Sequence, residues 1–331
     1  MKMRSMRRET IFTLAPFALV AVLAVGVALA GFIASPRARL DPAATQTSSA
    51  SASASNVASS QSPAAKASPS PAASAATIGP KSNDAGAMLS VHNELRAAVG
   101  APAVRADDRV TSAAQHHAEY LARAGAIGHD ETAGEPGFTG VSVRDRLAAQ
   151  GYADATASEV AASSDTGTED VRFLWDLPYH RLGLMHPHAV VAGWGHAEID
   201  GHTATVGVIV FDFSAAAPER VRSPETGQRV AGSWAGDESP DALPAGTARP
   251  VGYPVMVVYS GAKPVDLKNA KLSDSSGHDV AVSVIPQIYE RDYVGVVPIA
   301  PLAAGARYRV RFELSVGGND VVDEWEFETE R

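Results

Sequence analysis

The stretch TATVGVIVFDF, Thr203–Phe213, has the spacing of a β-strand that is apolar on both faces. Successive side chains of a strand point to opposite faces. Here Val206, Val208 and Val210 fall on one face and Ile209, Phe211 and Phe213 fall on the other. Such a strand needs cover on both sides, so it indicates a sheet between two helical layers. A second strand is predicted at 190–195.

Three amphipathic helices are predicted before this strand, at 84–99, 109–124 and 142–150. Each begins at a side chain that can cap a helix, namely Asp84, Asp107 or Asp108, and Ser142. Ser142 and Asp145 have the spacing of a capping box. A glycine follows each helix, at Gly100, Gly125 and Gly151, as is usual at helix ends.

Residues from about 216 to 331 have a different pattern, in which proline and glycine separate short segments of alternating polarity. Strands are predicted at 253–259, 280–285, 308–316 and 324–329. The end of the chain, Leu302–Thr329 with a Gly317-Gly318 turn, resembles a bacterial immunoglobulin-like module. The resemblance implies an all-β sandwich that acts as a spacer or packing partner, or that adheres to a wall polymer or protein.

Eight short motifs in residues 84–215 resemble, in order, the CAP superfamily (SCP or pathogenesis-related domain) in its bacterial form. They are His92-Asn-Glu-Leu-Arg96, Ala114-Gln-His-His-Ala118, Gly128-His129, Arg146-Leu147, Gly151-Tyr152, Ser158-Glu-Val-Ala161, Pro178-Tyr-His-Arg181 and Gly193-Trp-Gly195. The predicted fold class is therefore α+β: an α-β-α sandwich over 84–215, followed by an immunoglobulin-like sandwich over 216–331.

The resemblance also implies a site. In that family two histidines and acidic residues line a central cleft, and in several members they hold a divalent cation. The matching positions here are His129, Glu159 and His180. Imidazole and carboxylate are usual ligands of a zinc-like ion, and three protein ligands leave one position open for water. Without a metal, a histidine beside a glutamate can act as a general acid or base.

The sequence departs from the family pattern at two positions. The second acidic residue of the cleft has no clear counterpart, and Asp176 is the nearest carboxylate. Val160 replaces the usual asparagine after the cleft glutamate. One carboxylate fewer should weaken cation binding, which favours ligand binding over catalysis. Asp130 and Glu131 follow His129, but acidic residues in such a loop are expected to be solvated surface.

Other polar residues receive simpler interpretations. His117 falls on the apolar stripe of the second helix and is expected to be packed in the core. The run His186-Pro187-His188 suggests a metal, although the proline marks a loop. Arg181 is expected to pair with a carboxylate or to stiffen its loop.

The first 83 residues predict export. Residues 11–34 carry no charge and are long enough to cross a membrane as a helix. Four basic residues precede them, so residues 1–10 should stay in the cytoplasm as the end of a single-pass anchor. A cleaved signal peptide is the alternative, with a possible site at Ala28-Leu29-Ala30. Residues 35–83 are rich in Ala, Ser and Pro and predict a disordered stalk.

Net charge and cysteine content restrict the partners of the folded part and the ways in which it can be stabilised. Residues 84–331 carry 20 basic and 35 acidic side chains, a net charge of −15, which argues against nucleic acid as a partner. The chain has no cysteine, so packing alone must hold the exported domains. Signatures of zinc proteases, serine hydrolases, phosphate loops and dinucleotide sites are missing from the sequence.

Three functions remain open. The first is a membrane-anchored, surface-exposed CAP protein whose cleft binds a lipid, glycan or peptide, with or without a divalent cation. The second is a hydrolase of cell-wall or peptide substrates that uses His129, Glu159 and His180 around a metal-bound or base-activated water. The third is a structural or adhesive surface protein. The sequence does not distinguish an enzyme from a protein that only binds.

Overall fold

A computed structural model of the chain describes residues 81–331 except 165 and 262. The described residues fall within one compact unit. None of the helices in this part of the chain is both long and apolar enough to cross a bilayer. The predicted cytoplasmic segment 1–10, the anchor 11–34 and the stalk up to residue 80 lie outside the described residues.

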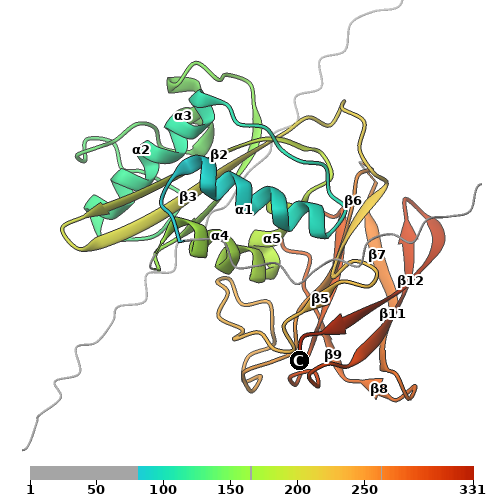
Figure 1. Ribbon diagram of the computed structural model, residues 1–331. Coiled ribbons are helices and arrows are strands. Elements are labelled where there is room, and N and C mark those ends of the chain that lie inside the picture. Colours follow the sequence, from blue (N-terminus) through green and yellow to red (C-terminus); the bar gives the residue numbers. More distant parts are fainter. Residues whose placement is uncertain (1–80, 165, 262) are drawn as a thin grey trace, which may run out of the picture. The chain divides into compact units, whose positions relative to one another are not determined.

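The first domain, called here the αβα domain, contains a short antiparallel sheet between helices (Figure 1). Its elements are α1 Ala85–Ala98, α2 Asp108–Ala124, α3 Val143–Ala149, β1 Thr156–Ala162, α4 Gly167–Asp176, α5 Pro178–Met185, β2 Ala189–Ile199 and β3 His202–Phe211. In the described part the strand order is β1-β3-β2, so β3, the two-sided apolar strand, is central and β1 is an edge.

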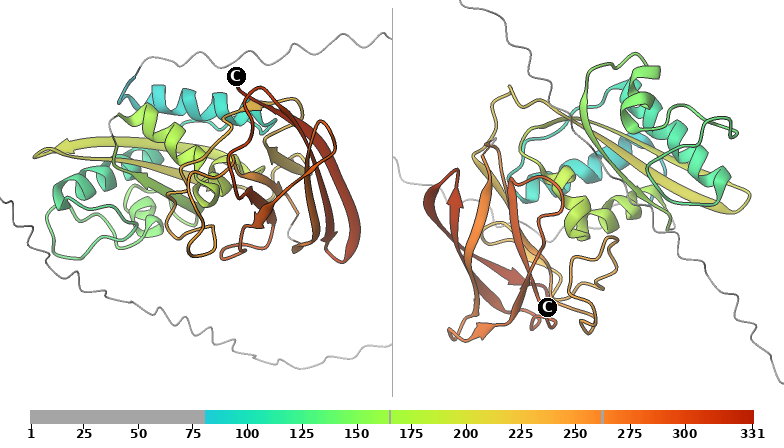
Figure 2. Two further views of the ribbon diagram at one scale, coloured as in Figure 1. Left: turned by 90° about the horizontal axis from the view of Figure 1, so that it is seen from below. Right: turned by 180° about the vertical axis from the view of Figure 1, so that it is seen from behind.

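Helices cover both faces of this sheet, as predicted. One apolar core joins α2 and α3 to one face of the strands, and includes Leu121, Leu147 and Val208. The other joins α1, α4 and α5 to the opposite face, and includes Met88, Leu174 and Ile209. Figure 2 shows the sheet edge-on in its left view, with α1 and α4 on one side and α2 on the other.

The predicted helix ends are confirmed. The Asp84 carboxylate accepts a hydrogen bond from Ala87 N at 2.9 Å, and Asp107 accepts from Arg109 N at 3.0 Å. Ser142 and Asp145 form the predicted capping box at the start of α3. Gly125 ends α2 with a φ of 60°, a left-handed conformation that glycine adopts without strain.

The Gly193-Trp194-Gly195 motif lets β2 lie directly on α2. A methyl group on Gly195 would overlap backbone atoms of Gln115, and one on Gly193 would overlap backbone atoms of Val110 and Thr111. The Trp194 ring is buried on the opposite face of the strand. Two glycines on either side of an aromatic residue therefore set the distance between helix and sheet.

We predict that Gly195→Ala lowers the free energy of unfolding by roughly 1–3 kcal/mol, because backbone atoms cannot move aside as a flexible side chain can. Chemical denaturation of the two proteins measures the difference. Gly128→Ala is the control, since a methyl group there meets no described atom within 4 Å. Equal losses in both variants would contradict the close-packing explanation.

The second domain, called here the β domain, consists of strands alone in its described part. They are β4 Arg220–Ser223, β5 Arg229–Val230, β6 Val255–Tyr259, β7 Val265–Asp274, β8 Asp279–Val280, β9 Val282–Val284, β10 Tyr293–Pro298, β11 Arg307–Val316 and β12 Asn319–Thr329. They form two sheets, ordered β4-β6-β10-β9 and β5-β12-β11-β7-β8. A core that includes Val257, Val296, Phe312 and Phe327 lies between the sheets, which is the predicted sandwich arrangement.

The two domains share a core instead of meeting through a linker. The cluster that covers α4 and α5 continues into the β domain through Trp234, Leu243, Met256 and Tyr293. Arg181 of α5 reinforces this join with hydrogen bonds to Ser223 Oγ and Pro254 O, both at 3.1 Å, and its guanidinium lies over the ring of Tyr253. Arg181 also donates to Trp175 O and to Asp176 O, so it holds its own segment, as one of the two predictions had it, and binds oxygens of the neighbouring domain as well.

His92 of α1 is fully buried beside the same core. Its Nε2 lies 2.9 Å from Leu184 O, and its ring packs edge-on against Trp194 with centroids 5.6 Å apart. Burial lowers the pKa of His92 from the ordinary 6.5 to about 3. The folded protein therefore holds this ring neutral at pH values where the unfolded chain would protonate it.

We predict that stability falls as the pH drops from 6.5 towards 3, because the unfolded state binds a proton at His92 that the folded state excludes. His92→Gln should remove up to about 1.4 kcal/mol per pH unit from that slope, the value for one proton. Urea denaturation at several pH values measures it. His202→Gln, at an exposed ring, serves as the control, and an unchanged slope for His92→Gln would refute the assignment.

Candidate functional site

A cleft of about 960 Å³ lies where the two domains meet. The αβα domain contributes His129, β1, α5 and the end of β3. The chain beyond it contributes Ser239, Val258, Gly261, Lys263, Pro264 and residues 289–293. His129, Glu159 and His180 all line it. The predicted site residues therefore share one cleft, but most of its wall comes from outside the motifs that predicted them.

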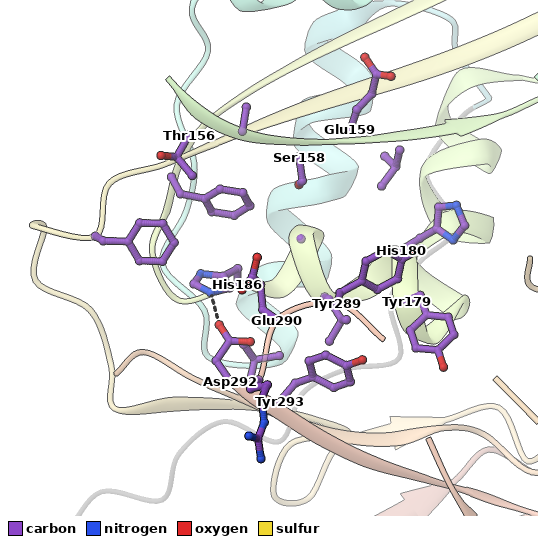
Figure 3. A pocket seen from close by; sticks show the side chains of 18 of the residues that line it. Thr156, Ser158, Glu159, Tyr179, His180, His186, Tyr289, Glu290, Asp292 and Tyr293 are labelled. Atoms are coloured by element: carbon purple, nitrogen blue, oxygen red, sulfur yellow. Dashed lines mark hydrogen bonds and ion pairs between the residues drawn. The ribbon is translucent and has the colours of Figure 1, made fainter. Parts of the chain in front are cut away.

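Strand β1 separates the polar groups of the cleft into two sets, one on each face of the sheet, because its side chains alternate between the faces. Val160 and Ala162 belong to the core under α4 and α5, whereas Ala161 belongs to the core under α2 and α3. Figure 3 shows Ser158 and Glu159 pointing to opposite sides of the strand. The Glu159 carboxylate therefore faces α2 and α3, while His180 lies on α5 beyond the other face.

The Glu159 carboxylate is almost fully buried and bonded on both oxygens. Arg146 Nη2 of α3 donates to Oε2 at 2.7 Å, and His129 Nδ1 lies 3.1 Å from Oε1. The side chain of Glu159 is 3% exposed, whereas that of His129 is 56% exposed. A carboxylate accepts hydrogen bonds, so Nδ1 of His129 carries the proton and Nε2 is the nitrogen left available. The pair is thus an anchored carboxylate holding an accessible imidazole.

A second buried carboxylate supports this pair. Glu131 is 3% exposed and accepts hydrogen bonds from the backbone of Thr139 at 2.5 Å and of Gly140 at 3.2 Å. Its Oε1 lies 2.9 Å from His117 Nδ1, and His117 Nε2 lies 3.4 Å from Glu159 Oε1. The expectation that Glu131 is solvated surface was wrong, because its backbone partners fold the loop over it. His117 is buried as expected, but it links two carboxylates.

His180 has a different carboxylate partner, Glu238. Its Nδ1 lies 2.9 Å from Glu238 Oε1, which also accepts hydrogen bonds from the backbone N–H groups of Tyr179 and His180. Asp176, the nearest acidic residue by sequence, does not line the cleft. Glu238 follows the αβα domain in a stretch with no motif or periodicity, so the sequence offered no signal for it.

His186 and His188 serve the join between the domains. His186 Nε2 lies 3.0 Å from Asp292 Oδ2, the contact drawn as a dashed line in Figure 3. His188 Nε2 lies 2.8 Å from Ser260 O and its Nδ1 lies 3.1 Å from Asp212 O. Each of these ring nitrogens makes a hydrogen bond to the protein. The two histidines therefore hold segments of the chain together, in place of the metal that the run suggested.

The described residues do not fit a resident divalent cation. Between residues 81 and 331, leaving aside 165 and 262, no group of three or more His, Cys, Asp or Glu side chains could hold a metal ion. The reason is visible at β1: Glu159 and His180 lie on opposite faces, and the Arg146 guanidinium already supplies the positive charge beside Glu159. We therefore derive no chemistry through a metal at His129, Glu159 and His180.

Comparison with known proteins agrees with the architecture. Residues 89–213 match the model of the CAP family, described as the cysteine-rich secretory protein family. This part of the chain is a CAP domain. It lacks the cysteines of the family name, since the chain contains none. A search of the curated proteins gave no match.

Solved structures with similarity to the chain include three bacterial proteins. An outer surface protein from Borrelia burgdorferi is 18% identical, with 38% of this chain and 89% of that chain covered and a TM-score of 0.33. An extracellular protein containing an SCP domain from Bacillus anthracis is 18% identical over 39% of this chain and 40% of that chain, with a TM-score of 0.33. CopC from Methylosinus trichosporium is 20% identical over 33% and 88%, with a TM-score of 0.24.

We predict that Arg146→Met lowers the free energy of unfolding by roughly 3–5 kcal/mol, because it leaves the buried Glu159 carboxylate without its cation. Denaturant titration at neutral pH is the measurement. Arg144→Met, on the exposed face of the same helix, is the matched control and should change stability by less than about 0.5 kcal/mol. A loss of similar size in the two variants would show that the buried ion pair has no special role.

Proposed function

We propose that this chain is an exported, surface-exposed CAP-domain protein that binds an amphipathic ligand, of lipid type, in the cleft between its two domains. The observation that carries the proposal is the surface of the cleft, which is mostly apolar and comes from both domains. Its volume of about 960 Å³ is within the range of small-molecule sites. The acidic charge of the folded part and the predicted anchor support a role outside the cell, away from nucleic acid.

Aromatic rings supply part of the apolar surface of the cleft. Phe211 and Phe213 pack beside His186, with ring centroids 5.0 and 5.6 Å from it. Tyr179 and Tyr289 meet edge-on with centroids 5.5 Å apart. Phe213 and Tyr289 are each 56% exposed although they lie in a hollow. Aromatic surface left open in a concave site is typical of ligand binding.

Polar and charged side chains also line the cleft, and its two imidazoles can contact a polar group of a ligand. His129 and His180 each present one ring edge to the cleft after their Nδ1 atoms are bound by carboxylates. Burial raises the pKa values of Tyr179, Tyr289 and Tyr293, so these phenols are neutral at physiological pH. We favour a lipid over a glycan because most of the accessible surface of the cleft is apolar.

Hydrolysis is the second candidate, and one observation favours it. Both cleft imidazoles are held through Nδ1 by a buried carboxylate, which leaves Nε2 in the form that can accept a proton from water. Glu159 itself is engaged on both oxygens, so it positions His129 and does not act as a base. Any turnover would therefore depend on the histidines.

Photoaffinity labelling tests the lipid proposal. The full chain is exposed to a photoreactive fatty acid, and labelled peptides are identified by mass spectrometry. We expect labels on peptides from both walls of the cleft, and a roughly tenfold loss of labelling in Phe213→Asp, because burying one aromatic side chain contributes about 1.5–3 kcal/mol. Phe138→Asp, at an exposed ring outside the cleft, is the control.

Competition distinguishes the ligand classes. Unlabelled fatty acid should displace the probe, whereas cell-wall oligosaccharides and peptides should not. Displacement by either of those, or labelling that is the same in Phe213→Asp and Phe138→Asp, would overturn the assignment of a lipid to this cleft.

A further inference from the structure

We infer that Glu238, which lies outside the CAP domain, is a positioning residue of the cleft: it fixes the His180 ring so that Nε2 faces the ligand. The inference deepens the proposed function and rests on it for the use of the cleft. The part that concerns geometry is the orientation and tautomer of the His180 ring, which can be measured without any ligand.

One oxygen of Glu238 makes three contacts with the start of α5. Oε1 accepts from Tyr179 N at 2.7 Å and from His180 N at 3.0 Å, and it lies 2.9 Å from His180 Nδ1. The side chain of Glu238 is fully buried, and that of His180 is 18% exposed. The carboxylate therefore lies behind the imidazole, which separates it from the cleft.

These contacts determine where the proton of His180 resides. Two backbone N–H groups donate to Oε1, so this oxygen acts as an acceptor and offers lone pairs to its third partner. Nδ1 of His180 must then carry hydrogen. In the neutral ring, Nε2 is consequently unprotonated and can accept a hydrogen bond from whatever enters the cleft.

The helix itself explains why a carboxylate from elsewhere is bound here. The N-cap residue of α5 is Leu177, whose side chain cannot accept a hydrogen bond, and Pro178 follows it. The first N–H groups of a helix need an acceptor and favour negative charge. Glu238 satisfies both needs from a distant segment of the chain, which makes its position well defined.

Helix capping does not explain why the whole Glu238 carboxylate is buried. Its second oxygen, Oε2, is buried without a hydrogen-bond partner in the part of the chain that the structure describes. A buried unpaired carboxylate oxygen costs stability, and an exposed acid could cap the helix without that cost. Groups that lower the stability of the fold are expected at functional sites.

The segment that carries Glu238 is held firmly. Trp234 and Val251 exchange backbone hydrogen bonds of 2.8 and 2.9 Å across it. Trp234, Ala242 and Leu243 are buried in the core shared with α4 and α5. Glu238 therefore comes from a packed arm, residues 231–254, and it supplies a carboxylate beside His180 where the family motifs of this sequence offer no clear second acid.

The tautomer of His180 tests the inference. Long-range proton–nitrogen correlation spectra of the full chain with ¹⁵N-labelled histidine distinguish the two neutral tautomers, and His180→Gln assigns the signals. We expect the Nδ1–H form in the wild type and in Glu238→Gln, whose amide oxygen still accepts. In Glu238→Ala we expect a shift towards the Nε2–H form.

Two controls keep the result interpretable. Glu290→Gln removes an exposed carboxylate of the same cleft and should leave the His180 signals unchanged. His129, held by Glu159, should keep its Nδ1–H form in every variant and so reports on folding. An Nε2–H tautomer in the wild type would overturn the inference even if Glu238→Ala failed to fold, as would identical His180 signals in wild type and a folded Glu238→Ala.

The same variants separate this inference from the proposed function. If the fatty-acid probe fails to bind while the tautomer shifts as expected, the ligand assignment is wrong and the role of Glu238 stands. If the probe binds and the tautomer does not respond, Glu238 is only a helix cap.

Discussion

The alternation of side chains along the edge strand β1 governs the arrangement of the cleft. Because neighbouring residues of a strand face opposite sides, Glu159 joins Arg146 and His129 on one face while α5 brings His180 to the other. No single carboxylate can hold both imidazoles in that geometry. The second carboxylate has to come from elsewhere, and the arm after the CAP domain supplies Glu238.

The β domain is part of the site as well as a neighbour of it. Its segments form one wall of the cleft, and its core is continuous with that under α4 and α5. Arg181 and His186 connect the domains through Ser223, Pro254 and Asp292. A spacer would need none of these contacts. The structure therefore favours the prediction that the β domain is a packing partner, and the cleft forms where the two domains pack.

Much of the fold could be predicted because its signals are local. Asp84 and Ser142 cap the helices they were expected to cap, and the two-sided strand 203–213 has helices on both faces. The pairing of His129 with Glu159 also follows from motif positions. Glu131 and Glu238 could not be predicted, since their burial depends on backbone N–H groups that a folded loop brings to Glu131 and that a distant helix brings to Glu238. Carboxylates in loops look alike in sequence until the fold supplies those partners.

Each cleft histidine is held by its own carboxylate, and the two pairs lie on opposite sides of β1. A crystal structure of the chain grown with zinc, using anomalous scattering to locate the metal, tests this most directly. We expect His129 bonded to Glu159 and His180 bonded to Glu238, with Arg146 still paired to Glu159. A zinc ion coordinated jointly by His129, Glu159 and His180, with Arg146 displaced, would contradict it.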